Sequence, residues 1–128
     1  VGEEGRLPFL AMQLLNGESL QDRLNRVGRL SSEETCRIGR EIADGLAAAH
    51  ARGLLHRDIK PDNIWLQAGG DRVRILDFGL VRLEGTESRL TAFGAVIGTP
   101  EFMAPEQAEG SEVDERCDLF SLGTLMYR

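Results

Sequence analysis

The stretch HRDIKPDNIWLQAGGDRVRILDFG, residues 56–79, places two short apolar segments on either side of a glycine-rich turn. The sequence is nearly symmetric about Gly70, so Ile64 is expected to face Leu76 across the turn AGGDR. The remaining pairs would be Trp65 with Ile75, Leu66 with Arg74 and Gln67 with Val73. Apolar runs that flank a turn of this composition predict a β-hairpin.

The open end of this hairpin brings two polar residues together. Asn63 precedes the first strand and Asp77 follows the second, so we expect their side chains to lie side by side. Amide and carboxylate oxygens are hard ligands of the kind that Mg2+ accepts. The pair is therefore a candidate metal site, although Asn and Asp are also common as turn and cap residues.

Length and composition place the chain among ordinary soluble globular domains. It has 128 residues, of which 41% are hydrophobic and 28% are charged, and its formal net charge is −6. Such an acidic chain is not expected to bind nucleic acid or an anionic membrane surface. Cys36 and Cys117 lie far apart without metal-ligand spacing, which indicates two reduced thiols and a reducing, cytoplasmic environment.

The clearest helix is predicted in residues 29–53. Ser31 and Glu34 form a capping box at its start, and Gly53 stands where a C-cap is expected. The apolar face of this helix is Ile38, Ile42, Leu46 and Ala49. His50 near the end of the helix is expected to be a packed, hydrogen-bonded side chain and not a metal ligand, because no second ligand recurs at helical spacing.

Other segments have weaker patterns. Residues 7–15, LPFLAMQLL, predict a buried strand that leads into a connecting segment, and residues 19–28 predict a short helix. Residues 80–101 lack periodicity and are rich in Gly, Ser and Thr, which is typical of a functional or disordered loop. Residues 118–128 read as the beginning of a buried helix.

Four motifs together resemble those of a protein kinase. In chain order they match the catalytic loop, the metal-binding loop, the substrate-facing loop and the start of the central helix: HRDIKPDN (56–63), DFG (77–79), GTPEFMAPE (98–106) and DLFSLG (118–123). Residues 45–64, GLAAAHARGLLHRDIKPDNI, and residues 95–107, AVIGTPEFMAPEQ, are most similar to the eukaryotic-like serine/threonine kinases of bacteria. The resemblance covers essentially the whole chain. It implies a partial α+β kinase fold, with the last small-lobe strand and hinge in residues 1–17 and the large lobe up to the central helix in residues 18–128.

The resemblance also implies roles for the polar residues of the catalytic loop. Asp58 is implied to orient the proton of a substrate hydroxyl, and Lys60 to place positive charge on the transferring phosphate. Asn63 and Asp77 are implied to bind Mg2+ (or Mn2+), which holds ATP. Lys60 resembles the serine/threonine class, and Thr99 fits that class because its hydroxyl is expected near Asp58.

A nucleotide site is implied along the hinge. Met12 corresponds to the gatekeeper residue, and the backbones of Gln13 and Leu15 would pair with adenine. Trp65 falls at the floor of the adenine site, where the indole could stack on the base or could serve only the core.

Regulation is implied by Arg57, which directly precedes Asp58. Arg57 is similar to the arginine of kinases that are switched by phosphorylation, and Thr91 is the first candidate phosphosite, ahead of Thr86 and Ser88. His56 is expected to pack and to hold the loop, while Asp118 is implied to hold the backbone of this loop from the central helix.

We therefore expect a fragment of a kinase domain, because no glycine-rich loop, strand lysine or small-lobe helix glutamate occurs in these residues. The expected function of the parent protein is ATP-dependent phosphorylation of Ser or Thr on protein substrates, and the fragment alone is expected to be inactive. Kinase–kinase dimers are possible in the parent, which could be membrane-anchored elsewhere. Apolar surface is expected along Leu119, Phe120 and Leu122.

Two alternatives stay open. The chain could belong to a catalytically silent pseudokinase that serves as a binding module, although the four chemical residues of the large lobe argue against this: Asp58, Lys60, Asn63 and Asp77. A small-molecule phosphotransferase of the aminoglycoside-kinase type would lack the APE segment and the lysine of the catalytic loop.

Overall fold

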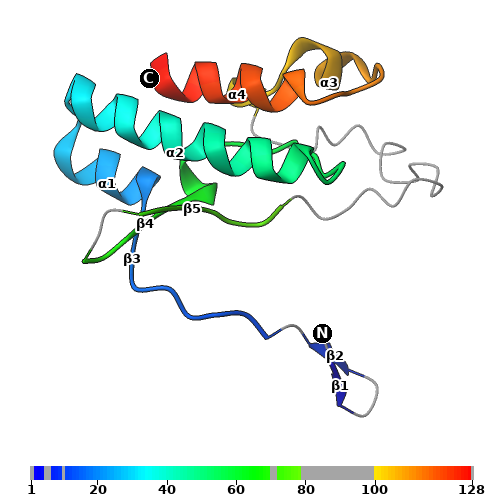
Figure 1. The fold of residues 1–128 in the computed structure, drawn as a ribbon, viewed down its shortest axis with the longest axis horizontal. Helices are drawn as coiled ribbons and strands as arrows, with labels where there is room; N and C mark the ends of the chain where they lie inside the picture. The colour runs from blue at the N-terminus through cyan, green and yellow to red at the C-terminus, as the bar shows by residue number, and fades with distance from the viewer. Residues whose placement is uncertain (1, 5–6, 10, 70–71, 79–99, 128) are drawn as a thin grey trace.

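The computed structural model describes residues 2–4, 7–9, 11–69, 72–78 and 100–127 (Figure 1). The strands are β1 (Gly2–Glu4), β2 (Leu7–Phe9), β3 (Gly17–Ser19), β4 (Ile64–Gln67) and β5 (Val73–Ile75). The α-helices are α1 (Leu20–Val27), α2 (Ser32–His50), α3 (Pro105–Glu109) and α4 (Arg116–Tyr127). Two short 3-10 turns, η1 (Pro61–Asn63) and η3 (Pro100–Phe102), complete the described elements. The predicted α+β class is confirmed.

Helix α2 begins and ends where the sequence predicts. The Ser31 hydroxyl accepts a hydrogen bond from the Glu34 backbone N–H at 3.2 Å, which satisfies one of the free amides of the first turn. At the other end Gly53 has φ +72, a conformation that a glycine adopts without steric cost. Its N–H donates to His50 O at 2.9 Å, and the N–H of Leu54 donates to Ala49 O at 3.1 Å, so the carbonyls of the last turn are capped.

The core lies on both sides of α2. This helix packs against α4 and against β5, so that α2 lies between α4 and the three-stranded sheet β3-β4-β5 (Figure 1). Gly39 allows the close approach of the two helices, because a Cβ there would lie 2.6 Å from the sulfur of Met126. The buried apolar cluster is Leu20, Ile38, Ile42, Leu46, Ile59, Ile64, Leu66, Phe102, Leu122 and Leu125. The predicted apolar face of α2 is confirmed.

The predicted β4–β5 hairpin is present, but its register differs by one residue. Ile64 pairs with Ile75 and not with Leu76. The turn is shorter than predicted, because the Gln67 N–H donates to Arg72 O at 2.9 Å and the ladder therefore closes one residue earlier on the second strand. A third strand, β3, pairs antiparallel with β4, which the symmetry of the hairpin could not reveal.

A slip of one residue moves every side chain of a strand to the other face of the sheet. The other predicted pairs change accordingly, to Trp65 with Arg74 and Leu66 with Val73. In this register Leu66 and Val73 share the face toward the core, and Arg74 is exposed. The predicted register would have placed Arg74 opposite the buried Leu66, where its charged group would be removed from water at a large cost in free energy.

The prediction of a buried strand over residues 7–15 is wrong. Only β2 is a strand, and it pairs with β1 in a two-stranded ribbon that lies apart from the helices (Figure 1). Leu7 is 76% exposed and Leu14 90% exposed. A two-stranded ribbon offers no second layer against which these side chains could be buried.

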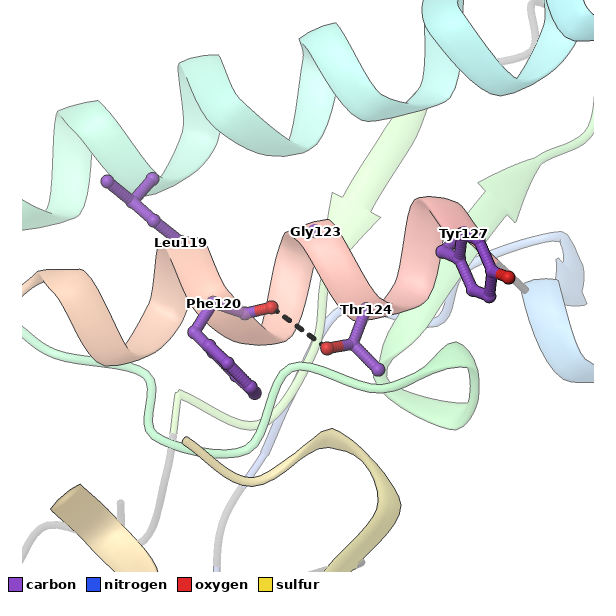
Figure 2. Close-up of a pocket in the computed structure, with 5 residues that line it drawn as sticks. All are labelled: Leu119, Phe120, Gly123, Thr124 and Tyr127. Carbon is purple, nitrogen blue, oxygen red and sulfur yellow. Dashed lines mark hydrogen bonds between the residues drawn. The ribbon is translucent and has the colours of Figure 1, made fainter. Parts of the chain in front are cut away.

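Helix α4 confirms the predicted buried helix in part. Leu119 and Phe120 are exposed as expected and line a shallow apolar hollow with Gly123, Thr124 and Tyr127 (Figure 2). The expectation for Leu122 is wrong, because Leu122 is only 7% exposed and lies in the core cluster. Leu122 lies on the same buried side of α4 as Cys117 and Leu125. No helix within the described residues is long and apolar enough to cross a bilayer.

Candidate active site

A buried carboxylate holds the backbone of the catalytic loop. Asp118, on α4, has no exposed surface. Its Oδ2 accepts from the His56 N–H at 2.9 Å, and its Oδ1 accepts from the Arg57 N–H at 2.7 Å. The Nε2 of His50, on α2, lies 2.8 Å from Asp118 Oδ2. Two helices therefore fix the start of the loop, and the expectation that His50 is a packed, hydrogen-bonded residue is confirmed.

His56 serves the structure of the loop and not its acid–base chemistry. Its ring is fully buried, and Nε2 lies 2.8 Å from Leu76 O, so this nitrogen must be the donor. The Nδ1 then accepts from the Asp58 N–H at 3.3 Å. The ring also packs edge-on against Phe78, with centroids 5.1 Å apart. Because both ring nitrogens are engaged with backbone groups, neither is directed at a substrate.

The local sequence turns the chain directly after Asp58. Ile59 is fully buried and anchors the loop in the core, so that its two neighbours point outward. Lys60 is extended, with φ −155 and ψ 164, as expected for a residue before proline. Pro61 then starts the η1 turn, which leads into β4. This bend returns Asn63 to the side chain of Asp58.

Asp58, Lys60 and Asn63 form one hydrogen-bonded cluster. Lys60 Nζ lies 2.8 Å from Asp58 Oδ2. The Asn63 amide donates from Nδ2 to the same Oδ2 at 3.1 Å and to the Asp58 backbone carbonyl at 2.8 Å. The side chains of Asp58 and Lys60 are 34% and 22% exposed, so both can be reached from solvent. The sequence prediction that these residues share a site agrees with this geometry.

Asn63 and Asp77 lie at the open end of the β4–β5 hairpin. Because of the corrected register, Asn63 O accepts from the Leu76 N–H at 2.8 Å, and Asp77 is the residue after that partner. Asp77 is exposed and has φ +48, a conformation that Asp tolerates better than most residues. The Asn63 Nδ2 group is directed at Asp58, so Oδ1 is the atom of this side chain that would bind a metal ion. The donor set, one amide oxygen and one carboxylate, fits Mg2+.

The predicted hinge residues lie in an extended segment, residues 11–16, that leads into β3. Met12 and Gln13 are exposed and Leu15 is half-buried. Trp65 lies on β4, opposite Ser19 of β3, and its indole is on the sheet face away from the core. Its Nε1 is buried without a hydrogen-bond partner in the part of the chain that the structure describes.

Four of the predicted residues lie outside the described residues: Thr99, Thr91, Thr86 and Ser88. Arg57 is described and its side chain is exposed, with the backbone in the left-handed region at φ +66.

Gln107 contacts the catalytic loop, a contact that the sequence patterns do not predict. Its Nε2 donates to Arg57 O at 2.9 Å. The segment APEQ does contain a local signal, since a Gln at the third position of a helix can cap the first turn. The contact to Arg57 spans 50 positions and depends on how α3 sits against the loop.

Cys117 is not a nucleophile in this site. Burial, followed by the neighbouring Asp118 carboxylate, raises the pKa of the Cys117 thiol to about 12. The group therefore stays protonated at neutral pH, and only a thiolate is reactive.

Comparison with known proteins agrees with this geometry. The sequence profile described as "Protein kinase domain" matches residues 3–128. The chain is 43% identical to the serine/threonine-protein kinase pkn2 of Myxococcus xanthus over 99% of this chain and 16% of that protein. It is 41% identical to PknL of Mycobacterium tuberculosis (98% of this chain, 31% of that protein) and 36% identical to PknB of Mycobacterium leprae (96% and 20%). The chain thus spans less than a third of the length of these relatives. With a catalytic-loop cluster and a profile match over nearly its whole length, the chain belongs to the protein kinase domain family.

Proposed function

We propose that the protein to which these residues belong is a serine/threonine protein kinase, which transfers the terminal phosphoryl group of ATP to hydroxyl groups of protein substrates. One observation carries the proposal: a single carboxylate oxygen, Asp58 Oδ2, contacts both Lys60 Nζ and Asn63 Nδ2. This arrangement holds one oxygen of Asp58 and leaves the other, Oδ1, for a substrate hydroxyl.

Asp58 orients the hydroxyl of the substrate and accepts its proton as the bond to phosphorus forms. Lys60 lies beside this carboxylate and neutralises negative charge on the phosphoryl group during transfer. Phosphoryl transfer depends mainly on position and charge neutralisation, so a rigid cluster suits the reaction. Thr99 completes the site in this proposal, near Asp58 and Lys60.

Asn63 Oδ1 and the Asp77 carboxylate would hold Mg2+, or Mn2+ in its place. When bound, the ion neutralises phosphate charge and holds the nucleotide in position. The fixed amide of Asn63 prepares one ligand in advance, since both of its N–H groups are already used by Asp58.

Met12, Gln13, Leu15 and Trp65 form the adenine side of the nucleotide site in this proposal. The segment that carries the first three leads directly into β3, which pairs with the strand of Trp65. We divide the domain accordingly, with the last small-lobe strand and hinge in residues 1–17 and the large lobe in residues 18–128. The boundary falls within β3.

Arg57 would bind a phosphate on Thr91 through its exposed guanidinium, which can form charge-assisted hydrogen bonds with phosphate oxygens. Because Arg57 directly precedes Asp58 in the chain, this contact would act next to Asp58. We further propose a cytoplasmic kinase domain that acts on protein substrates and not on nucleic acid, and that can pair with a second kinase domain in the parent. The 128 residues alone are expected to be inactive.

The test uses the full-length parent protein, ATP with Mg2+, and a generic Ser/Thr protein substrate. Asp58→Asn should lower kcat by roughly 10²- to 10⁴-fold, because the proton acceptor is lost while the shape is kept. Asp62→Asn is the matched control: Asp62 lies in the same loop and is exposed, so its activity should stay within about twofold of wild type. Mass spectrometry should find the product phosphate on Ser or Thr.

Two results would count against the proposal. A wild-type protein that binds ATP but transfers no phosphate would favour the binding-module alternative. Equal activity of Asp58→Asn and Asp62→Asn would remove Asp58 from the chemistry.

A further inference from the structure

The peptide group between Arg57 and Asp58 is held from both sides. Its N–H, on Asp58, donates to His56 Nδ1 at 3.3 Å, and its carbonyl, on Arg57, accepts from Gln107 Nε2 at 2.9 Å. This peptide directly precedes the Cα of Asp58. Its orientation therefore sets the direction in which the Asp58 side chain leaves the backbone.

The backbone at this point needs external support. Arg57 has φ +66, which a residue with a side chain adopts only when its surroundings impose it. Asp118 holds the N–H of Arg57 at 2.7 Å, and Gln107 holds its carbonyl. Of these two contacts, only the one from Gln107 comes from outside the buried core, since Gln107 is half-buried while Asp118 has no exposed surface.

Gln107 is itself oriented by α3. Its Oε1 accepts from the Ala104 N–H at 3.2 Å, and its own backbone N–H donates to Ala104 O at 3.0 Å. With the side-chain oxygen engaged at the start of α3, the NH2 group is directed to the Arg57 carbonyl. The side-chain amide thus uses both ends, one on each of two chain segments.

The segment that carries Gln107 is anchored to α4. The hydroxyl of Ser121, on α4, donates to Phe102 O at 2.7 Å, and Phe102 and Ala104 are buried. Residues 101–110 directly follow Gly98–Thr99–Pro100 in the substrate-facing motif. A shift of this segment would therefore pull on the Arg57 carbonyl through Gln107.

We propose that Gln107 is a positioning residue, which couples the placement of the substrate-facing segment to the orientation of Asp58 through the Arg57 carbonyl. This inference rests on the proposed kinase activity. It assigns to Gln107 no contact with substrate or nucleotide, so its effect should fall on the transfer step and not on ATP binding.

The test is Gln107→Glu in the full-length protein. A carboxylate can still accept from the Ala104 N–H, but it cannot donate to Arg57 O and it faces that carbonyl with negative charge. We expect kcat to fall about tenfold while KM for ATP and the thermal midpoint stay close to wild type. Exchange of the Asp58 amide hydrogen should become faster. Gln107→Met is neutral and similar in length, and should show the same loss of kcat.

The matched control is Gln21→Glu, on α1. The Gln21 amide donates to Asn25 Oδ1 at 2.8 Å, so the control removes a comparable hydrogen bond and adds the same charge away from the catalytic loop. Its kcat should equal that of wild type. If wild type transfers phosphate and both Gln107 variants keep its kcat, this inference alone is overturned. Parallel losses of thermal midpoint, KM and kcat would also overturn it, in favour of a structural role. A wild-type protein without transfer activity would refute the proposed function, and this inference with it.

Discussion

Replacement of Asp118 should release the catalytic loop from the helical core. Asp118 is fully buried, and its two oxygens accept the N–H groups of His56 and Arg57 at 2.9 and 2.7 Å. Asp118→Ala leaves both backbone donors without an acceptor and also removes the contact of Asp118 Oδ2 with His50 Nε2 at 2.8 Å. Asp118→Asn keeps the shape and one acceptor oxygen, so one of the two donors retains its partner.

The magnitude follows from these contacts. A hydrogen bond to a charged acceptor contributes about 1.5–3 kcal/mol, so loss of both gives roughly 3–6 kcal/mol. Removal of the buried charge recovers part of its desolvation cost, and we expect a net loss of about 3–5 kcal/mol in the free energy of unfolding for Asp118→Ala. In Asp118→Ala, we expect the free energy of local opening of the loop to fall by about 2.7 kcal/mol, which makes exchange of the Arg57 amide hydrogen about a hundredfold faster. In Asp118→Asn, the exchange rate should change about tenfold.

Hydrogen–deuterium exchange with single-residue resolution, on the full-length protein, measures this effect directly. Asp44→Ala on the exposed face of α2 is the control and should change the unfolding free energy by less than about 0.5 kcal/mol. Wild-type exchange rates at His56 and Arg57 in Asp118→Ala would refute the reasoning. So would an Asn variant that exchanges as fast as the Ala variant, because the retained oxygen would then have no effect.

Three further predictions concern the sheet and the thiols. Gly17→Ala should destabilise the protein by about 2–4 kcal/mol in thermal or urea unfolding, because Gly17 has φ +144 and a Cβ there would lie 2.0 Å from Leu66 O. The control is Gly28→Ala, at φ +78 with nothing within 4 Å of the added Cβ, which should destabilise the protein by only about 1–2 kcal/mol. Equal losses of stability in the two variants would contradict the predicted clash at Gly17. Iodoacetamide should modify the exposed Cys36 in the native protein and the buried Cys117 only after unfolding. Because the pKa of the Cys117 thiol is raised from 9.0 to about 12, its contribution to stability is present below pH 9 and is lost as the pH rises toward 12, which unfolding curves at increasing pH would detect.

Local patterns in the sequence determined helix α2. The Ser31 cap, the apolar face from Ile38 to Ala49 and the left-handed Gly53 of α2 all appear where the residues predict them. Each depends on groups at most five positions apart or on one helical face, so no knowledge of the packing is needed. The motifs of the catalytic loop likewise indicated the kinase family, because their residue types and order do not depend on the fold being known.

Local patterns in the sequence did not predict the register of the sheet. The near-symmetry about Gly70 indicated a hairpin but gave the wrong register, since the same residues can pair in two ways that differ by one position. The packing of Leu66 and the half-buried Val73 against the core on one face, and the pairing of β3 with β4, decide between the two registers. The same holds for Leu122, which is buried because α4 turns that face toward α2 and leaves Leu119 to solvent.

The sequence by itself determined which chemical groups are present and that Asp58, Lys60 and Asn63 lie within one turn of chain. The tertiary structure decided what holds them in place: Asp118, 61 positions from Arg57, and Gln107, 50 positions from it. Contacts of this kind leave no periodic signal, because they join single polar atoms on separate elements. They form only once α3 and α4 have packed against the rest of the domain, where a buried N–H or C=O must find a partner.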